Sequence, residues 1–174
     1  MPSYPQPTLT NGRLTLRPPR TGDIPALVAA CQDPEIPRWT RVPSPYTEEH
    51  ARAWLATEVE GVRLFIVDPD DRFLGTIALM ELDPERGYAE IGYWVAAEAR
   101  GRGVASGAVA LLRDWAAGEL GVSLIEILVH RDNAASLRVP ERAGFAATGE
   151  LRDAPARMER KTGPVYVVFA WSAA

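Results

Sequence analysis

The chain has 174 residues, which is enough for one domain with a sizeable hydrophobic core. Hydrophobic residues make up 47% and charged residues 24%, close to the globular average, which argues against a wholly disordered chain. The formal net charge of −4 offers no bulk positive field, so neither nucleic acid nor a membrane surface is expected as a partner. Cys31 is the only cysteine, which excludes an internal disulfide and a multi-thiolate metal site, and we expect it in a helix core and no metal.

Residues 1–8 are expected to form a flexible tail, and residues 9–174 one domain. The proline-rich segment Met1–Pro7 lacks the basic patch and apolar run of a signal peptide, and no apolar stretch approaches the length of a membrane span. We therefore expect a cytoplasmic protein.

Periodicity predicts a strand and two helices in the first third of the chain. Gly12–Arg17 alternates with period two, as a strand does, and is followed by two prolines. A helix capped by Thr21 or Asp23 comes next. Asp33–Pro45 contains four prolines and excludes a long regular element, after which Thr47 is a good N-cap for a second helix.

The rest of the chain alternates strands and helices. Strand-like runs at 62–67, 73–82 and 88–95 are separated by turn clusters of hairpin length, which predicts an antiparallel meander. A helix is expected after Gly103, an apolar strand at 124–130, a short helix after Asn133, and closing strands at 145–151 and 165–171. The order β-α-α-β-β-β-α-β-α-β-β predicts an α+β domain around one mixed sheet.

The most informative segment is Arg100-Gly101-Arg102-Gly103-Val104-Ala105-Ser106, between a predicted strand and a predicted helix. Its two glycines let the backbone turn tightly and approach a ligand closely. The amides that follow belong to a helix N-terminus, where free N–H groups and the positive end of the dipole favour an anion. The two arginines suit phosphate, so the segment predicts a pyrophosphate site.

This glycine-rich segment does not match the common nucleotide-binding motifs. A dinucleotide-binding fingerprint fails because Ser106 stands where the third glycine would be, and a Walker motif fails because no Lys-Ser/Thr pair follows. A glycine-rich connection with surface arginines fits the local pattern as well as a phosphate site does. The choice between a phosphate site and an ordinary loop therefore depends on the surrounding elements.

The surrounding elements resemble those of the GNAT acetyltransferase superfamily. Its signature, Arg/Gln-x-x-Gly-x-Gly/Ala after the fourth strand, corresponds to Arg100-Gly101-Arg102-Gly103-Val104-Ala105. The preceding Ala89-Glu90-Ile91-Gly92-Tyr93-Trp94-Val95 is similar to the strand before that loop in the RimJ/RimL branch. Asn133-Ala134-Ala135-Ser136 with Ala143-Gly144-Phe145 is similar to the next signature of that branch. The resemblance extends in element order over about residues 9 to 172.

The resemblance implies an α+β, GNAT-like fold: a mixed, mainly antiparallel central sheet flanked by about four helices and splayed between the fourth and fifth strands. It implies acetyl-CoA as co-substrate, with the pyrophosphate on the amides of Arg102–Ser106. The pantetheine arm would pair along the strand that ends at Val95, which requires the two strands to separate after Gly92 or Trp94. The residues implied in cofactor binding are Tyr93, Trp94, Val95, Arg100, Gly101, Arg102, Gly103, Val104, Ala105, Ser106, Asn133 and Ser136.

Such a reaction needs a neutral amine, and an α-amino group with a pKa of about 8 requires only a modest base. Glu90 is our candidate base because it lies on the strand beside the expected thioester; a carboxylate on a solvated face explains it equally well. Glu126 is a weaker choice, and His130 is more commonly explained as a structural histidine. A backbone N–H near Tyr93–Val95 would stabilise the oxyanion.

A departing thiolate leaves reasonably well unaided; where it takes a proton, the donor in many members of the family is a tyrosine seven residues after the asparagine. Pro140 occupies that position here, so Ser136, which matches the serine of the RimL-like signature, is the candidate. Ser136 and Asn133 could instead act only as capping residues. Because Pro140 cannot donate to the carbonyl of Ser136, we predict a kink or break in the helix there.

The acceptor is poorly encoded. Trp39, Tyr46 and Trp54 are expected to line the acceptor side, as the first two helices do in the family, although these rings could equally belong to the core. Arg38 and Arg41 could attract an acidic substrate or remain solvated. We predict transfer to a primary amine, foremost a protein N-terminal α-amino group. A small-molecule amine such as an antibiotic or polyamine, and a non-catalytic acyl-CoA-binding module, are the alternatives; edge strands are compatible with a homodimer.

Overall fold

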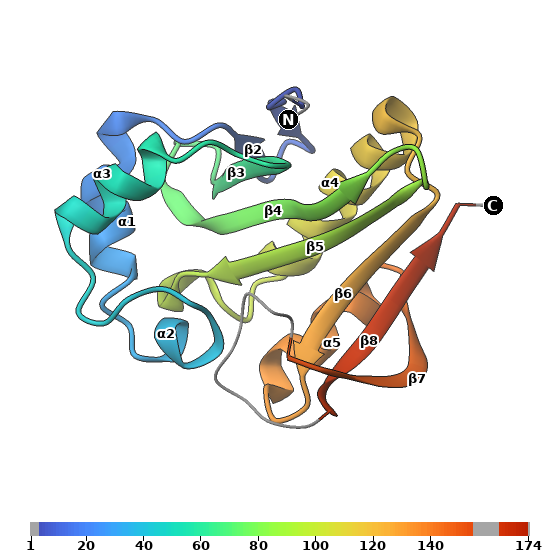
Figure 1. Cartoon of the computed structure of the whole chain (residues 1–174). Coiled ribbons are helices and arrows are strands. Elements are labelled where there is room, and N and C mark those ends of the chain that lie inside the picture. The colour runs from blue at the N-terminus through green and yellow to red at the C-terminus, as the bar shows by residue number, and fades with distance from the viewer. Residues whose placement is uncertain (1–3, 155–163, 174) are drawn as a thin grey trace.

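The computed structural model describes residues 4–154 and 164–173. In these residues, eight strands form an open sheet in the order β1-β2-β3-β4-β5-β6-β8-β7 (Figure 1). The strands are β1 (Leu9–Thr10), β2 (Thr15–Arg17), β3 (Val62–Val67), β4 (Phe73–Asp83), β5 (Tyr88–Val95), β6 (Leu124–His130), β7 (Ala146–Asp153) and β8 (Pro164–Ser172). The helices are α1 (Ile24–Ala30), α2 (Glu35–Trp39), α3 (Glu48–Ala56), α4 (Val104–Leu120) and α5 (Ala134–Arg142), with two 3-10 turns, η1 (Thr21–Asp23) and η2 (Ala97–Ala99).

The predicted strand and helix order is confirmed, with two additions. The bounds of β3, β5 and β6 agree with the prediction residue for residue, and β3, β4 and β5 form the predicted antiparallel meander. The predicted strand Gly12–Arg17 is instead the second half of a short hairpin, because Gly12 adopts a left-handed φ of +81° and the Asn11 side chain accepts two backbone N–H groups of the turn. The proline-rich segment contains the five-residue helix α2, which is too short to show a periodicity.

The sheet divides between β5 and β6. These strands run parallel and pair only through Tyr88–Glu90 with Leu124–Glu126, whereas the other strand pairs in the described residues are antiparallel. Beyond this short stretch β5 and β6 diverge (Figure 1). Because β1 was not predicted, β5 and β6 are the fourth and fifth predicted strands, and the predicted splay between them is confirmed. The pairing ends at Glu90, before both predicted positions, Gly92 and Trp94.

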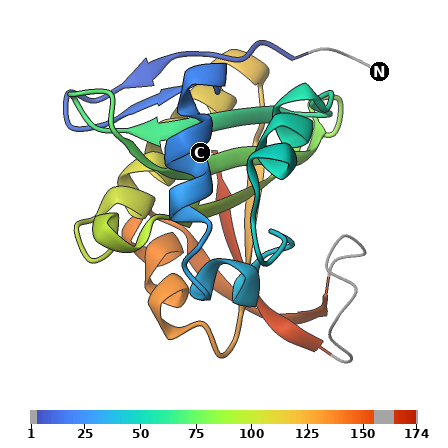
Figure 2. The same ribbon diagram turned by 90° about the vertical axis from the view of Figure 1, so that its left-hand side faces the viewer.

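Two buried clusters hold the sheet. The larger cluster lies between the sheet and α4, and its β5 members are Ala89, Ile91 and Val95. The smaller cluster joins α1 and α3 to the opposite face at Phe65 and Val67, and Figure 2 shows α1 in front of the strands there. Because side chains alternate along a strand, neighbouring residues of β5 face different layers.

The smaller cluster also holds Cys31, at the C-terminal end of α1, where the side chain is buried. Burial raises the pKa of its thiol to about 12. A thiol of that pKa stays protonated at neutral pH and is a poor nucleophile, as expected of a core residue.

The segment next to the N-terminus contacts the sheet. Gln6 donates to the Gly61 carbonyl and accepts from the Arg63 amide, each at 2.9 Å, and Tyr4 donates to the Leu82 carbonyl at 3.5 Å. The extent of a flexible tail stays a prediction for residues 1–3, which lie outside the described residues. The strand predicted at 145–151 corresponds to β7, which extends as far as Asp153. None of the helices in the described ranges has the length and apolar character that crossing a bilayer requires.

Candidate active site

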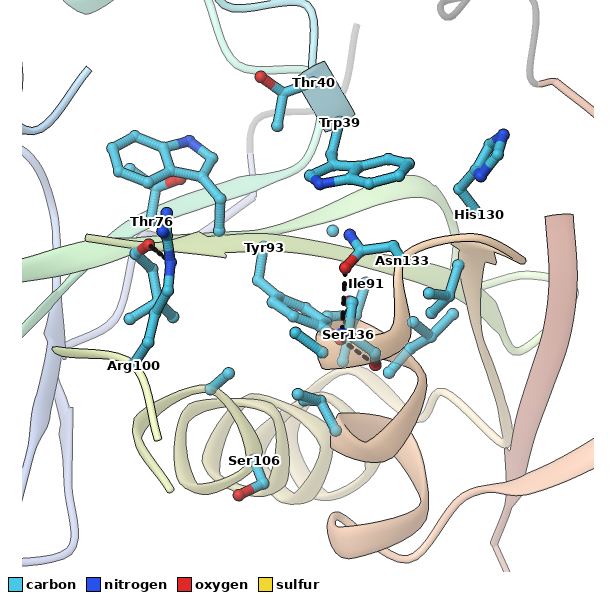
Figure 3. Close-up of a pocket in the computed structure, with 18 of the residues that line it drawn as sticks. Trp39, Thr40, Thr76, Ile91, Tyr93, Arg100, Ser106, His130, Asn133 and Ser136 are labelled. Atoms are coloured by element: carbon cyan, nitrogen blue, oxygen red, sulfur yellow. Dashed lines mark hydrogen bonds between the residues drawn. The ribbon is translucent and has the colours of Figure 1, made fainter. Parts of the chain in front are cut away.

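A cavity of about 720 Å³ lies where β5 and β6 separate (Figure 3). Its walls come from β4, β5, the η2–α4 loop, β6, α5 and α2. Most residues predicted for the cofactor line it: Tyr93, Trp94, Val95, Arg100, Gly101, Gly103, Val104, Ala105, Ser106, Asn133 and Ser136. Arg102 is exposed and does not line this cavity, so its side chain is not placed with the others.

The loop before α4 has the backbone geometry of an anion cradle. Gly101 and Gly103 both adopt left-handed conformations, with φ of +71° and +75°. A Cβ at Gly101 would meet no atom within 4 Å, so the outer face of the loop is open. The Gly107 amide donates to the Gly103 carbonyl, while the three amides before it belong to the first turn and have no partner within the helix. Those amides and the helix dipole favour a phosphate at this end of the cavity.

Arg100 connects the loop before α4 to the end of β5 and to the segment before α2. Its Nε donates to the Val95 carbonyl at 3.1 Å, and its guanidinium forms an ion pair with Asp33 at 2.6 Å. The backbone amide of Glu35 and the Arg100 guanidinium together hold the pKa of Asp33 below its ordinary value, against a smaller effect of burial. Arg100 therefore connects the end of β5 to the segment that precedes α2, and a contact with phosphate stays a prediction.

One edge of β5 faces the cavity. From Glu90 to Val95 the strand pairs with β4, and its pairing with β6 has already ended at Glu90. Ile91–Val95 therefore presents alternate N–H and C=O groups towards the gap. An extended chain with its own amide groups, such as a pantetheine arm, can add to such an edge.

Tyr93 meets Ser136 on one wall of the cavity. The Tyr93 hydroxyl oxygen lies 2.9 Å from Ser136 Oγ and 3.4 Å from the Ser136 carbonyl oxygen (Figure 3). Burial raises the pKa of Tyr93 to about 12, and the hydrogen bond with Ser136 opposes this rise. Asn133 is the N-cap of α5, because its Oδ1 accepts from the Ser136 amide at 3.2 Å.

Pro140 lies in the last turn of α5 without breaking it. The helix runs continuously to Arg142, and the Ala143 amide donates to the Val139 carbonyl at 3.1 Å. The predicted break is therefore not found. Proline cannot donate to the carbonyl four residues earlier, which belongs to Ser136, and the Tyr93 hydroxyl lies at that carbonyl instead.

Glu90 lies on the opposite face of β5 from Tyr93 and lines the cavity with 5% of its surface exposed. Glu126, its neighbour across the strands, does not line the cavity. Both Glu126 oxygens accept from the Arg152 guanidinium, at 2.6 and 3.0 Å, and one also accepts from the Tyr88 hydroxyl at 2.9 Å. The structure thus gives Glu126 a role in joining β7 to β5 and β6, and disfavours it as a base.

His130 ends β6 at the cavity wall. Its Nδ1 accepts the Asp132 amide at 3.2 Å, so a neutral ring carries its proton on Nε2. The ring packs between Trp39, with ring centroids 5.3 Å apart, and Tyr166, at 5.4 Å. These contacts support the structural interpretation of His130.

The three aromatic residues predicted for the acceptor side do not stay together. Trp39 lines the cavity and lies across the gap between β5 and β6 (Figure 3). Tyr46 is buried in the smaller cluster, and Trp54 packs at 5.8 Å on Phe65 beneath the Arg63 guanidinium. These two rings belong to the core between α3 and β3, so the structure does not place them at an acceptor site.

The two arginines near α2 also differ. Arg41 lines the cavity, whereas Arg38 lies over the Trp39 ring at 4.7 Å and pairs with Glu35.

Sequence reasoning missed Arg138 and Arg142, which line the cavity from α5. Their spacing of four residues could have revealed a shared face of that helix. Tyr166, which reaches the cavity from β8, left no such signal.

The sheet divides beside a glycine loop and a helix N-terminus. This arrangement is the one expected of an acyl-CoA-dependent acyltransferase. The sequence profile of the acetyltransferase (GNAT) domain matches residues 13–146. The chain is 32% identical over 173 residues to the uncharacterized N-acetyltransferase p20 of Bacillus licheniformis, with 95% of this chain and 94% of that one covered. The chain belongs to the GNAT acetyltransferase family.

Two further relatives match over about half of the chain. The ribosomal-protein-serine acetyltransferase of Escherichia coli (strain K12) is 35% identical over 94 residues, which cover 53% of this chain and 51% of the relative. The spermidine N(1)-acetyltransferase of the same organism is 27% identical over 89 residues, 51% of this chain and 48% of the relative.

Solved structures agree in fold. The acetyltransferase (GNAT family) from Bacillus anthracis superposes with a TM-score of 0.80 at 18% identity, over 95% of this chain and 98% of that one. The spermidine N-acetyltransferase from Vibrio cholerae, solved with CoA and spermine, gives a TM-score of 0.72 at 21% identity, over 92% and 94%.

The site fits the co-substrate of this family. The open left-handed glycines and the free amides of α4 suit a pyrophosphate, and the unpaired edge of β5 suits an extended arm. The protein is therefore a GNAT-type N-acetyltransferase that uses acetyl-CoA. No group of three or more potential ligand side chains that could hold a metal occurs in the part of the chain that the structure describes.

Proposed function

We propose that the protein acetylates a primary amine, foremost the N-terminal α-amino group of a protein, by direct attack in a ternary complex. The observation that carries this proposal is the position of Glu90. This buried carboxylate lines the same cavity as the glycine loop, together with Trp39 of α2 and His130 of β6. The donor-binding backbone and a candidate base thus meet where β5 leaves β6.

Acetyl-CoA supplies an activated acetyl group. The amides of Arg102–Ser106 would hold its pyrophosphate, and the free edge of Ile91–Val95 would align its pantetheine arm. A backbone N–H between Tyr93 and Val95 would stabilise the developing oxyanion. Asn133 caps the turn that places Ser136 at the cavity wall.

Glu90 would accept the proton of the amine, and the Ser136 hydroxyl would donate to the departing sulfur. The C–N bond forms as the C–S bond breaks; solvent then takes the proton from Glu90 and returns one to Ser136, so that the proton lost by the amine balances the one gained by the thiol. A single carboxylate suits an α-amino group, because a pKa of about 8 leaves about a tenth of it neutral at pH 7. A lysine side chain, with a pKa of about 10.4, would need a much stronger base.

The similarity to the ribosomal-protein-serine acetyltransferase supports a place in the RimJ/RimL branch, and hence a protein acceptor. The similarity to spermidine acetyltransferases supports a polyamine as the second candidate. Cavity-lining Glu35, Glu90 and the Trp39 ring would also suit a small cation.

The test is an acceptor panel with acetyl-CoA. It contains peptides that begin with serine or alanine, the same peptides with a blocked N-terminus and a free lysine, and spermidine. Mass spectrometry locates the acetyl group, and a thiol reagent follows the release of CoA. We expect modification of the free N-termini. Modification of spermidine alone would favour the polyamine function, and CoA binding without turnover would favour a binding module.

A further inference from the structure

The hydrogen-bond ladder of α5 has one gap inside the cavity wall. Pro140 has no N–H, so the Ser136 carbonyl lacks the partner that an ordinary helix would provide. Tyr93, 43 residues earlier and on β5, brings its hydroxyl to 3.4 Å from this carbonyl oxygen and to 2.9 Å from Ser136 Oγ. One phenol thus contacts both polar oxygens of the same serine.

We propose that Tyr93 is a positioning residue that orients the Ser136 hydroxyl towards the departing sulfur. The inference rests on the proposed function, in which Ser136 is that donor. Either oxygen can be the donor in the 2.9 Å contact, and in the catalytic arrangement the phenol gives its one proton to Ser136 Oγ. The Ser136 hydrogen is then free to point to a third partner, and the cavity lies on that side.

Neighbouring contacts keep this arrangement in place. The Tyr93 ring packs against the larger core cluster, which limits its movement. Asn133 Oδ1 holds the Ser136 amide at 3.2 Å and fixes the first turn of α5. With a pKa of about 12, Tyr93 stays protonated throughout the neutral range and keeps the proton that it donates.

The removal of single hydroxyls tests the inference. Tyr93→Phe keeps the ring and its packing, and Ser136→Ala removes the donor. We expect Tyr93→Phe to lower kcat about three- to tenfold, while the Kd of CoA, measured by calorimetry, changes less than about twofold. In the Ser136→Ala background, Tyr93→Phe should have no further effect on kcat, because its partner is already lost. Tyr46→Phe, a buried phenol outside the cavity, is the matched control and should leave kcat unchanged.

A second readout needs no acetyl-CoA. In urea unfolding of the free protein, the double variant should lose less stability than the sum of the two single variants, since both remove the same hydrogen bond. Effects on kcat that multiply, or losses of stability that add, would overturn the inference. Coupled unfolding with no turnover of any amine by the wild-type protein would instead overturn the proposed function and leave the Tyr93–Ser136 contact established.

Discussion

Glu90 and Glu126 face each other in the last pair that joins β5 to β6, and only Glu90 lines the cavity. Glu126 is bound by the Arg152 guanidinium and the Tyr88 hydroxyl. Two adjacent carboxylates repel each other, so the guanidinium on Glu126 reduces the cost of keeping a second negative charge beside it. We therefore expect the same change, glutamate to glutamine, to affect turnover at Glu90 and stability at Glu126.

Glu90→Gln should reduce kcat about 10- to 100-fold, because it removes the proposed base while keeping the shape of the side chain. The affinity for CoA should not change. Glu126→Gln is the matched comparison and should lower the free energy of unfolding by about 1–2 kcal/mol, through its contacts with Tyr88 and the partly exposed Arg152. Steady-state kinetics and urea unfolding measure both effects. Turnover by Glu90→Gln within twofold of wild type would contradict the assignment of the base.

Gly101→Ala should weaken CoA binding about tenfold, because the added Cβ occupies the open face where phosphate approaches. Gly121→Ala provides the control. Gly121 has a similar φ of +68° and equally open surroundings, but lies at the far end of α4. Both variants should lose about 1 kcal/mol of stability from backbone strain, and only Gly101→Ala should lose affinity in calorimetry. Equal affinities in the two variants would argue against a phosphate site at this loop.

The arginines of the cavity provide a third test. Coenzyme A is a polyanion, so Arg138→Ala and Arg142→Ala should each raise the Kd of CoA, by about two- to fivefold at low salt and less at high salt. Arg102→Ala should have a smaller effect, because its exposed side chain lies outside the cavity lining. Calorimetry at two salt concentrations distinguishes them. A larger effect of Arg102→Ala would restore the role that the loop sequence first predicted for it.

The stability of the protein should fall in acid through Asp23. Burial opposes the ionisation of Asp23, but hydrogen bonds from Arg17 and the Arg20 amide outweigh it, so the pKa lies below its ordinary value of 3.8. The unfolded chain then binds this proton more readily than the folded one. Stability is therefore fully present above about pH 4 and is lost as the pH falls through the lower, folded pKa.

Asp23→Asn tests this pH dependence. The variant should be less stable near neutral pH, and its unfolding free energy should depend less on pH below about pH 4. Glu58→Gln, on an exposed surface, is the control and should retain the wild-type profile. Urea unfolding at a series of pH values measures the profiles. An unchanged acid dependence in Asp23→Asn would show that other carboxylates cause it.

The sequence predicted backbone features better than side-chain partners. Strand-like and apolar runs bounded by turn residues placed β3, β5 and β6 correctly, and Gly103 and Asn133 marked the starts of α4 and α5. These features depend on local propensities, which can be read from residues close together in the sequence. The short strand β1 and helix α2 were not predicted, because two and five residues are too few to show a period.

Side chains that meet across the fold could not be predicted in this way. An aromatic residue in or beside a helix does not reveal which neighbour it will touch, so Trp54 and Tyr46 looked as suitable for the acceptor side as Trp39. The contact of Tyr93 with Ser136 depends on how α5 packs against β5, and the ion pair of Glu126 depends on the course of β7. Tertiary packing decides each of these contacts.

The divergence of β5 from β6 should change the rate at which backbone amide protons of β5 exchange with solvent. Hydrogen bonds to a neighbouring strand slow their exchange with solvent, and on the β6 side of β5 these bonds stop at Glu90. Alternate amides of Ile91–Val95 should therefore exchange quickly in the free protein, while those bonded to β4 stay protected. If the bound arm completes the sheet, the fast set will slow on addition of CoA, and deuterium uptake will map the arm along β5.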